Sequence, residues 1–321
     1  MGVRVCILTT VHYVFDTRIF HKQAKSLVKA GYEVVLIAQH DKEEVVDEVR
    51  IVPLPRPKNR FEQMLKLTWR ALILAVRERA DVYHFHDPEL LPVGILLKML
   101  TKARVIYDVH EDYPESILTK RWIPEPLRRL IAKTFDKFEK LASRFIDGLV
   151  VATDGIAEKF RELNPVIVRN YPVLEMFPQS DAGYCSGKEK ILVYIGLISK
   201  LRGAVEMVKA VEILSSKLEV KLRLIGKFDT EKLKQELENM PGFAKVEFLG
   251  WHTPDKVYNF LKDACVGLVC LHPEPRYVEA LPVKLFEYMA SGLPIVASNL
   301  LLWKEIVEEN GCGVCQSFGS W

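Results

Sequence analysis

The sequence predicts an α/β protein with two mostly parallel sheets, each covered by helices on both faces. Short runs rich in β-branched residues alternate with longer amphipathic runs, which is typical of such sheets. At 321 residues, the chain is longer than one typical domain, which indicates two. A polar stretch with Gly and Ser, Gln179–Lys188, separates two series of this alternation. We therefore expect two consecutive Rossmann-like domains that face a central cleft.

The first series, residues 1–172, predicts one sheet with its covering helices. Thr17–Ala30 fits an amphipathic helix that Gly31 ends, and Phe61–Ala80 fits another. The expected strands are Arg4–Leu8, Glu33–Ile37, Arg50–Val52, Val82–Phe85, Arg104–Val109, Gly148–Val151 and Val166–Val168.

The second series, residues 189–321, follows an expected linker at residues 173–188. Ligands of such sheets bind beyond the carboxyl ends of the strands, so we look for site residues there. The expected strands are Ile191–Tyr194, Lys221–Ile225, Lys245–Phe248, Val266–Cys270 and Pro294–Ala297, and the series ends at Gly313–Cys315.

Composition excludes several classes of protein. A net charge of +3 is too small to indicate a nucleic-acid partner. We expect a cytoplasmic protein, because no apolar run is long enough to cross a bilayer and Met1–Thr10 reads as a strand. Cys6, Cys265 and Cys270 lie in apolar strands, which predicts reduced core thiols. The single Cys312–Cys315 pair is interpreted as structural, since no second pair exists to complete a zinc site.

The most informative segment is Glu279–Ser298, which places two carboxylates around the start of a helix. Pro282 suits a helix start, and Gly292 suits its end. Glu279 then lies in the preceding loop, and Glu287 about one and a half turns into the helix. Two acids, one lysine (Lys284) and a helix N-terminus at a sheet edge suit a phosphorylated, hydroxyl-rich ligand.

This segment resembles the paired-glutamate signature of the retaining glycosyltransferases of family four, which have the GT-B fold. The form Lys-Leu-Phe-Glu-Tyr-Met-Ala before Gly-x-Pro is common among members that assemble polysaccharides or glycolipids. The resemblance implies that Glu287 holds the ribose hydroxyls of a nucleotide-sugar donor, and that Glu279 faces the donor sugar and the leaving diphosphate. Members usually continue with further helices, which this chain is expected to lack. A second copy or a partner chain would then cover the exposed flank.

The loop Tyr194–Gly203 is a second candidate for the donor site. Its backbone N–H groups and cations suit a diphosphate. Similar enzymes carry two phosphate-binding cations in this loop. Arg202 matches the second, whereas Leu197 stands in place of the first. Lys200 by itself is interpreted as a solvated turn residue. Gly226 either lets the backbone approach a ligand closely or simply ends a strand. The expected donor-binding residues are Gly196, Arg202, Gly226, Lys284, Leu285 and Glu287.

In the first half, polar residues follow three expected strands. Asp16 suits a helix cap, and Arg18 is its partner or an acceptor contact. His110 matches the family's histidine near the donor sugar and the acceptor, where it can orient a hydroxyl or assist proton movement. The resulting expectation is a catalytic set of His110, Glu279 and Arg202, and an acceptor side of Arg18, His86, Asp87 and Glu111.

Two other chemistries were weighed for this region. His84, His86, Asp87, His110, Glu111 and Asp112 have metal-ligand chemistry, but the resemblance implies catalysis without a metal, and we expect none. His84 is interpreted as a core residue or one that supports its neighbours. The chain has no G-x-G-x-x-G motif, which argues against a dinucleotide oxidoreductase.

Residues 119–145 read as a basic amphipathic helix. Between Thr119 and Arg144, eight Lys or Arg oppose three Asp or Glu and alternate with large apolar residues. One interpretation is peripheral contact with an anionic membrane. The other is an apolar stripe packed on the sheet with a solvated basic back.

The sequence thus predicts a glycosyltransferase that moves a sugar from a nucleotide-sugar donor to a saccharide or lipid-linked acceptor, with the retention that the resemblance implies. The nucleotide sugar is a substrate, and no cofactor is expected. Two alternatives remain: a non-catalytic GT-B-like partner subunit, favoured by Leu197 and the missing helices, and a sugar-nucleotide epimerase or hydrolase on the same scaffold.

Overall fold

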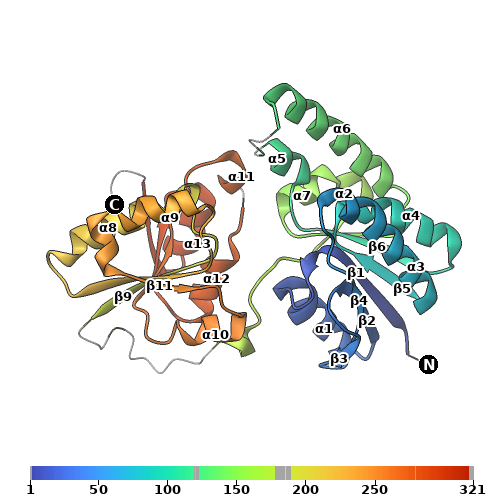
Figure 1. The fold of residues 1–321 in the computed structure, drawn as a ribbon, viewed down its shortest axis with the longest axis horizontal. Helices are drawn as coiled ribbons and strands as arrows, with labels where there is room; N and C mark the ends of the chain where they lie inside the picture. The colour runs from blue at the N-terminus through green and yellow to red at the C-terminus, as the bar shows by residue number, and fades with distance from the viewer. Residues whose placement is uncertain are drawn as a thin grey trace. The chain divides into compact units, whose positions relative to one another are not determined.

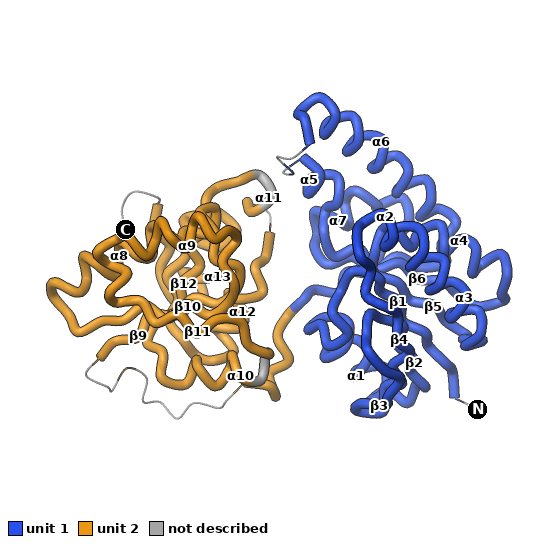
Figure 2. Tube along the Cα trace, viewed as in Figure 1, with its two compact units in different colours: residues 1–170 blue, residues 171–321 orange. Residues whose placement is uncertain are grey.

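The chain folds into two compact units, residues 1–170 and 171–321 (Figure 2). The computed structural model describes residues 2–118, 120, 123–177, 185, 189–278 and 280–317, without the side chains of residues 254, 255, 275 and 276. No helix in these ranges is long and apolar enough to span a membrane.

Unit 1 is built on an eight-stranded sheet in the order β3-β4-β2-β1-β5-β6-β7-β8. All neighbouring strands pair in parallel except β3 and β4, which are antiparallel. The chain builds outward from β1 in one direction and then returns to add β5 on its other side. The strands are β1 (Arg4–Tyr13), β2 (Glu33–Gln39), β3 (Glu44–Val46), β4 (Val49–Leu54), β5 (Val82–Phe85), β6 (Arg104–Val109), β7 (Gly148–Val151) and β8 (Val166–Ile167).

Helices cover both faces of this sheet (Figure 1). The expected helix at Thr17–Ala30 is present, but its first part, Thr17–Ala24, has π-helical geometry. Asp16 caps it as predicted, because its carboxylate accepts from the N–H groups of Arg18 and Ile19. The α-helices are α1 (Lys25–Lys29), α2 (Arg60–Glu62), α3 (Thr68–Glu78), α4 (Leu91–Leu100), α5 (Tyr113–Leu118), α6 (Glu125–Ser143) and α7 (Asp154–Lys159).

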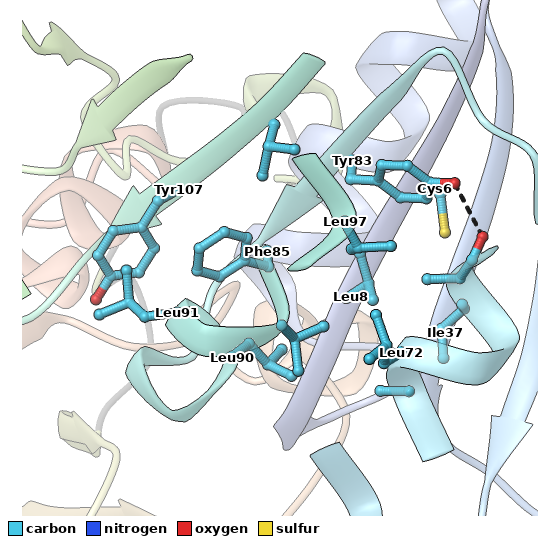
Figure 3. Close-up of a cluster of buried hydrophobic side chains, with 14 of the residues drawn as sticks. Cys6, Leu8, Ile37, Leu72, Tyr83, Phe85, Leu90, Leu91, Leu97 and Tyr107 are labelled. Atoms are coloured by element: carbon cyan, nitrogen blue, oxygen red, sulfur yellow. Dashed lines mark hydrogen bonds between the residues drawn. The ribbon is translucent and has the colours of Figure 1, made fainter. Parts of the chain in front are cut away.

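One core of unit 1 lies between the sheet and the helices α3 and α4 (Figure 3). The rings of Phe85 and Tyr107 stack there at 4.8 Å between centroids. The hydroxyl of Tyr83 donates to the carbonyl of Ala75 on α3 at 3.0 Å, which satisfies the one polar atom of a fully buried ring. This packing fixes β5 and β6, whose carboxyl ends carry the candidate site.

Unit 2 has a six-stranded, fully parallel sheet in the order β11-β10-β9-β12-β13-β14. Its strands are β9 (Lys190–Ile195), β10 (Val220–Ile225), β11 (Val246–Gly250), β12 (Val266–Val269), β13 (Ile295–Ser298) and β14 (Gly313–Gln316). Its helices are α8 (Ala204–Ser215), α9 (Glu231–Glu238), α10 (Pro254–Asn259), α11 (Pro275–Val278), α12 (Val283–Ala290) and α13 (Leu301–Glu308). The predicted α/β class with two parallel sheets is confirmed.

The expected linker at residues 173–188 begins too early. Phe177 is buried in a core of unit 2, and its ring lies 4.0 Å from that of Tyr258. Residues 173–177 therefore belong to unit 2, because an aromatic anchor fastens them to it. Most of Gln179–Lys188 lies outside the described residues.

The expectation of a reduced thiol at Cys265 is wrong in this structure. Cys265, just before β12, forms a disulfide with Cys185, which precedes β9. The two cysteines are 80 residues apart in sequence, so local pattern could not reveal that they meet. Cys6 and Cys270 are buried and unpaired, as expected.

Candidate functional site

In each sheet, the chain reverses the direction in which it adds strands, between β1 and β5 in unit 1 and between β9 and β12 in unit 2. Crevices at such positions, beyond the carboxyl ends of the strands, are the usual ligand sites of parallel sheets. Most of the predicted site residues lie at these two edges.

A buried carboxylate, Asp108 on β6, organises the edge of unit 1. Arg18 donates two hydrogen bonds to it, from Nε at 3.1 Å and from Nη2 at 2.8 Å. Burial opposes its charge, but the hydrogen bonds and charges of His86 and Arg18 hold the pKa of Asp108 well below its usual range. Arg18 also donates to the carbonyl of Val168 at 3.0 Å.

Asp87 has a comparable structural task. Its carboxylate accepts from the hydroxyl of Thr9 at 2.9 Å and from the backbone N–H groups of Thr10 and Val11. These bonds shape the end of β1. Arg18 and Asp87 are buried and hydrogen-bonded within unit 1. His86 is also buried, with Nδ1 3.3 Å from Oδ2 of Asp108 and Nε2 without a hydrogen-bond partner among the described residues. Their contact with an acceptor stays a prediction. Glu111, in contrast, is exposed at the same edge.

His110 lies against a second histidine, His12. Their Nε2 atoms are 3.1 Å apart, and Nε2 of His12 is also 3.4 Å from Oδ1 of Asp87. One of two bonded imidazole nitrogens must carry the proton. Because Asp87 can only accept, the arrangement favours the proton on Nε2 of His12. His110 then accepts through Nε2 and carries its own proton on Nδ1.

This proton on Nδ1 of His110 is available to a ligand. The atom is buried and has no hydrogen-bond partner in the described part of the chain. Burial, together with the nearby His86, lowers the pKa of His110 to about 4, so the ring is neutral near pH 7. A neutral imidazole that presents an N–H can donate to a hydroxyl or to an anionic oxygen.

His84, His86 and Asp108 offer metal-ligating atoms within 4.8 Å of one another. These ligand types suit a divalent cation, but the local charge does not. Asp108 already forms an ion pair with Arg18 through two hydrogen bonds, and it also accepts a hydrogen bond from Gln23. A divalent ion here would face the guanidinium at close range. Catalysis without a metal therefore stays our prediction.

In unit 2, two cations converge, and only the charge of Glu287 partly compensates that of Lys284. The Lys284 Nζ lies 4.0 Å from the centroid of the Tyr194 ring and forms no hydrogen bond with any described residue. Burial first, and then the charge of Arg202, lower the pKa of Lys284 to about 7. Arg202 itself is held by hydrogen bonds to Tyr277 and Tyr194. A buried, unpartnered ammonium beside a guanidinium is a site for an anion.

The glycines of this edge make room for that arrangement. A Cβ on Gly196 would lie 3.4 Å from Nζ of Lys284 and 3.6 Å from Nη1 of Arg202, so both cations flank this glycine. A Cβ on Gly226 would lie 1.9 Å from the carbonyl oxygen of Gly196. Gly226 thus serves close packing between two loops, a role that the sequence interpretation had not considered.

The helix of the paired glutamates begins one residue later than expected, with Pro282 as its cap and Val283 as its first residue. Glu287 accepts from the hydroxyl of Tyr258 at 3.3 Å and remains partly exposed. The side chain of Leu285 is fully buried, and its N–H donates to the carbonyl of Pro282. Its donor-binding role stays a prediction. Glu279 lies outside the described residues.

Two family models match the chain. Residues 17–173 match the Glycosyl transferase 4-like domain, and residues 180–321 match Glycosyl transferases group 1. Together the two matches cover most of both units, including the carboxyl edges of both sheets. This chain is a glycosyltransferase.

Solved structures show that this glycosyltransferase has the GT-B fold. It is similar to sucrose-phosphate synthase from Thermosynechococcus elongatus, with 17% identity, a TM-score of 0.71, and coverage of 99% of this chain and 86% of that one. HepE from Anabaena in complex with UDP-glucose gives 13% identity and a TM-score of 0.70 over 99% and 86% of the two chains. WaaG, a glycosyltransferase involved in lipopolysaccharide biosynthesis, has 16% sequence identity and a TM-score of 0.65, with coverage of 99% of this chain and 86% of that one. No curated protein matches this glycosyltransferase in sequence.

Sequence analysis missed two residues at the carboxyl edge of the sheet in unit 1. Asp108 lies in an apolar strand. A single carboxylate in such a strand indicates a buried cation nearby, because a buried charge needs a partner of opposite charge. His12 is the last residue but one of β1 and precedes its partner His110 by 98 residues, so no local pattern joins the two.

Proposed function

We propose that the anion site of unit 2 holds the diphosphate of a nucleotide-sugar donor, and that the enzyme transfers this sugar to a saccharide or lipid-linked acceptor. The single observation that carries the proposal is the buried Lys284 without a hydrogen-bond partner among the described residues, beside Arg202. A diphosphate supplies negative charge to both cations and the acceptor oxygen that Lys284 lacks. The bound UDP-glucose of the structurally similar HepE agrees with this donor class.

Each site residue then has a task. Departure of the diphosphate builds negative charge on its oxygens, and Arg202 and Lys284 stabilise that charge as it develops. Glu287 accepts from the ribose hydroxyls, and Glu279 faces the donor sugar. His110 donates from Nδ1 to a sugar hydroxyl or a phosphate oxygen. Glu111 is a candidate on the acceptor side.

We further propose that the enzyme belongs to the retaining family four and assembles polysaccharide or glycolipid. The Glu279–Ser298 signature supports this assignment, and the similar WaaG is involved in lipopolysaccharide biosynthesis. The acceptor would attack the same face from which the diphosphate leaves, without a carboxylate nucleophile of the kind that retaining glycosidases use. No metal or other cofactor is required in this scheme.

A turnover assay tests the proposal. The enzyme is incubated with UDP-, GDP- and ADP-sugars, with and without saccharide or lipid-linked acceptors, and release of nucleoside diphosphate is measured. We expect turnover of one donor class that depends on the acceptor, with the anomeric configuration retained by NMR. Lys284→Met should lose most of this activity. Lys200→Met is the matched control, since Lys200 is exposed and pairs with Glu236 at 2.6 Å.

Other outcomes have definite meanings. Consumption of the donor without any acceptor would replace transfer by epimerase or hydrolase activity. Binding without turnover of any donor would favour the partner-subunit alternative. Equal activities of Lys284→Met and Lys200→Met would contradict the assignment of the diphosphate site.

A further inference from the structure

Helix α12 carries Lys284 and Glu287, and it also carries a buried tyrosine to which the proposed function assigns no task. Tyr288 follows Glu287 directly and lies about one turn after Lys284. Its side chain is fully buried. Burial raises the pKa of its hydroxyl well above the usual range, so the group stays protonated and can both donate and accept a hydrogen bond.

The hydroxyl of Tyr288 takes the place of a strand partner near the carboxyl end of β9. The strands β9 and β12 are paired as far as Val193 and Gly267. Two residues further along β9, the N–H of Ile195 donates to the Tyr288 hydroxyl at 3.1 Å. The hydroxyl in turn donates to the carbonyl oxygen of Val193 at 3.4 Å. One side chain of α12 thus satisfies two backbone groups of β9.

A glycine of β12 makes room for the tyrosine ring. A Cβ on Gly267 would lie 2.4 Å from Cδ2 of Tyr288, so a side chain at this position would displace the ring. The ring therefore packs on β12 through a contact that depends on glycine, while the hydroxyl reaches across to β9. Together, the ring and its hydroxyl fix the position of α12 relative to both strands.

The part of β9 that is held in this way borders the two cations. Ile195, whose N–H donates to Tyr288, is followed by Gly196, and a Cβ on Gly196 would lie 3.4 Å from Nζ of Lys284. The same Nζ lies 4.0 Å from the ring centroid of Tyr194, which precedes Ile195. The distance between Lys284 and the end of β9 therefore depends on how closely α12 is held against this strand.

We propose that Tyr288 is a positioning residue of the anion site, and that its hydroxyl holds α12 against β9 so that Lys284 and the loop of Gly196 meet the same anion. If the hydroxyl only satisfied buried backbone groups, its loss would change stability alone. A positioning role has a further consequence, because the helix and the strand contribute different groups to one ligand. The inference rests on the proposed function, which identifies that ligand as the diphosphate of a nucleotide.

Nucleotide binding by Tyr288→Phe tests the inference. This change removes the hydroxyl, keeps the ring and takes away the acceptor of the Ile195 N–H. The full chain is titrated with UDP, GDP and ADP by calorimetry, and its stability is measured by urea unfolding. For the nucleotide that the wild type binds, we expect Tyr288→Phe to raise the Kd by about tenfold or more.

Matched controls in unit 1 separate positioning from stability. Tyr83 is also fully buried, and its hydroxyl donates to the Ala75 carbonyl, so Tyr83→Phe should lower stability comparably and leave the Kd unchanged. A second variant, Gly267→Ala, displaces the Tyr288 ring from β12 and should also raise the Kd. Its control is Gly94→Ala, whose Cβ would lie 2.5 Å from Cε1 of Phe85 in the core of unit 1.

A double-variant cycle shows whether Tyr288 acts through Lys284. If it does, the losses of affinity in Lys284→Met and Tyr288→Phe should not multiply. The double variant should then bind at least about threefold more tightly than independent effects would give.

Three results would overturn the inference and leave the proposed function intact. The first is a Tyr288→Phe protein that binds the nucleotide as tightly as the wild type does. The second is an equal rise in the Kd of Tyr83→Phe. The third is a cycle in which the two losses multiply. A wild type that binds none of the three nucleotides would contradict the proposed function, and the inference would fall with it.

Discussion

Lys284 and Arg202 determine, at the scale of single residues, what unit 2 can bind. Neither cation faces a described carboxylate at hydrogen-bond distance, and Lys284 is almost fully buried. A lysine in that position is half-neutral near pH 7, because burial and the neighbouring guanidinium lower its pKa to about 7. An anionic ligand should restore its charge.

We predict that binding of a nucleotide sugar takes up a proton above neutral pH. The bound diphosphate favours the ammonium, so the pKa of Lys284 rises on binding. Below about pH 7 the lysine is already charged, whereas at pH 8 it must gain a proton, and affinity should fall as pH rises further. Calorimetry at pH 8 in buffers of different ionisation enthalpy should detect close to one proton for the wild type and none for Lys284→Met. A wild type that takes up no proton contradicts the assignment.

A second prediction at this scale concerns His12. It holds His110 through Nε2, so His12→Ala should lower kcat by about ten- to a hundredfold by freeing the His110 ring, which assists proton movement or orients a hydroxyl. The Kd for the nucleoside diphosphate should not change, because its cations lie in unit 2. His12→Gln, which can place an N–H near the same position, should recover part of the rate. An equal loss in both variants, or a changed Kd, would mean that His12 acts only on the fold.

Candidate residues for the donor site could be singled out within single sequence segments, whereas residues that meet across strands could not. Glu287, Lys284 and Arg202 came from segments whose spacing and context carry the chemistry. Asp108 and His12 gain their meaning only when the sheet brings them to Arg18 and His110. Leu285 shows the converse, since a place in a motif does not reveal that a side chain points into the core.

At the scale of elements, the loops after β9 and β10 depend on each other through Gly226 and Gly196. We predict that Gly226→Ala destabilises the protein by at least about 2 kcal/mol, because its Cβ would overlap the Gly196 carbonyl and its φ is 147°. It should also weaken nucleotide binding by shifting Gly196. Urea unfolding and calorimetry measure both effects.

Gly311→Ala is the matched control. Gly311 also has a positive φ, of 62°, but a Cβ there meets no atom within 4 Å. Only the backbone conformation should then cost free energy, about 1 kcal/mol. Equal destabilisation by the two substitutions would show that close packing of Gly226 on Gly196 is unimportant.

Sequence patterns located the expected strands to within a few residues, because β-branched runs between helices leave little alternative. They failed where tertiary contacts decide. The attachment of Phe177 to unit 2 and the disulfide of Cys265 depend on distant residues. The π-helical geometry of Thr17–Ala24 was not predicted either. The exposed leucines of α6, Leu130 and Leu141, show the same limit, since periodicity identifies an apolar face but not whether it is buried.

At the scale of the whole molecule, the buried histidines of unit 1 link stability to pH. Burial lowers the pKa of His110 to about 4 and that of His84 to about 3, against 6.5 for a free histidine. The unfolded chain therefore binds more protons below pH 6.5, so stability present above that pH is lost as pH falls towards 4.

Glu139 opposes this effect in part, because burial raises its pKa to about 7 and the folded state then gains a proton as pH falls. We therefore predict a net loss of about 2–3 kcal/mol in the free energy of unfolding between pH 7 and pH 4.5, measured by urea denaturation. His110→Asn should reduce this dependence, because asparagine does not titrate. His252→Asn, in unit 2, should leave it unchanged. A His110→Asn protein with the pH dependence of the wild type would refute the assignment.

The central claim is that unit 2 of this glycosyltransferase binds the nucleotide of a sugar donor through Glu287 and the two cations. Calorimetric titration with UDP, GDP and ADP tests it most directly, on the wild type, on Glu287→Gln and on the exposed control Glu305→Gln. The account predicts that one nucleotide binds with a Kd in the micromolar to millimolar range. Glu287→Gln should weaken that binding about tenfold or more, while Glu305→Gln should not change it. Failure of all three nucleotides to bind, or equal binding by the two variants, would contradict it.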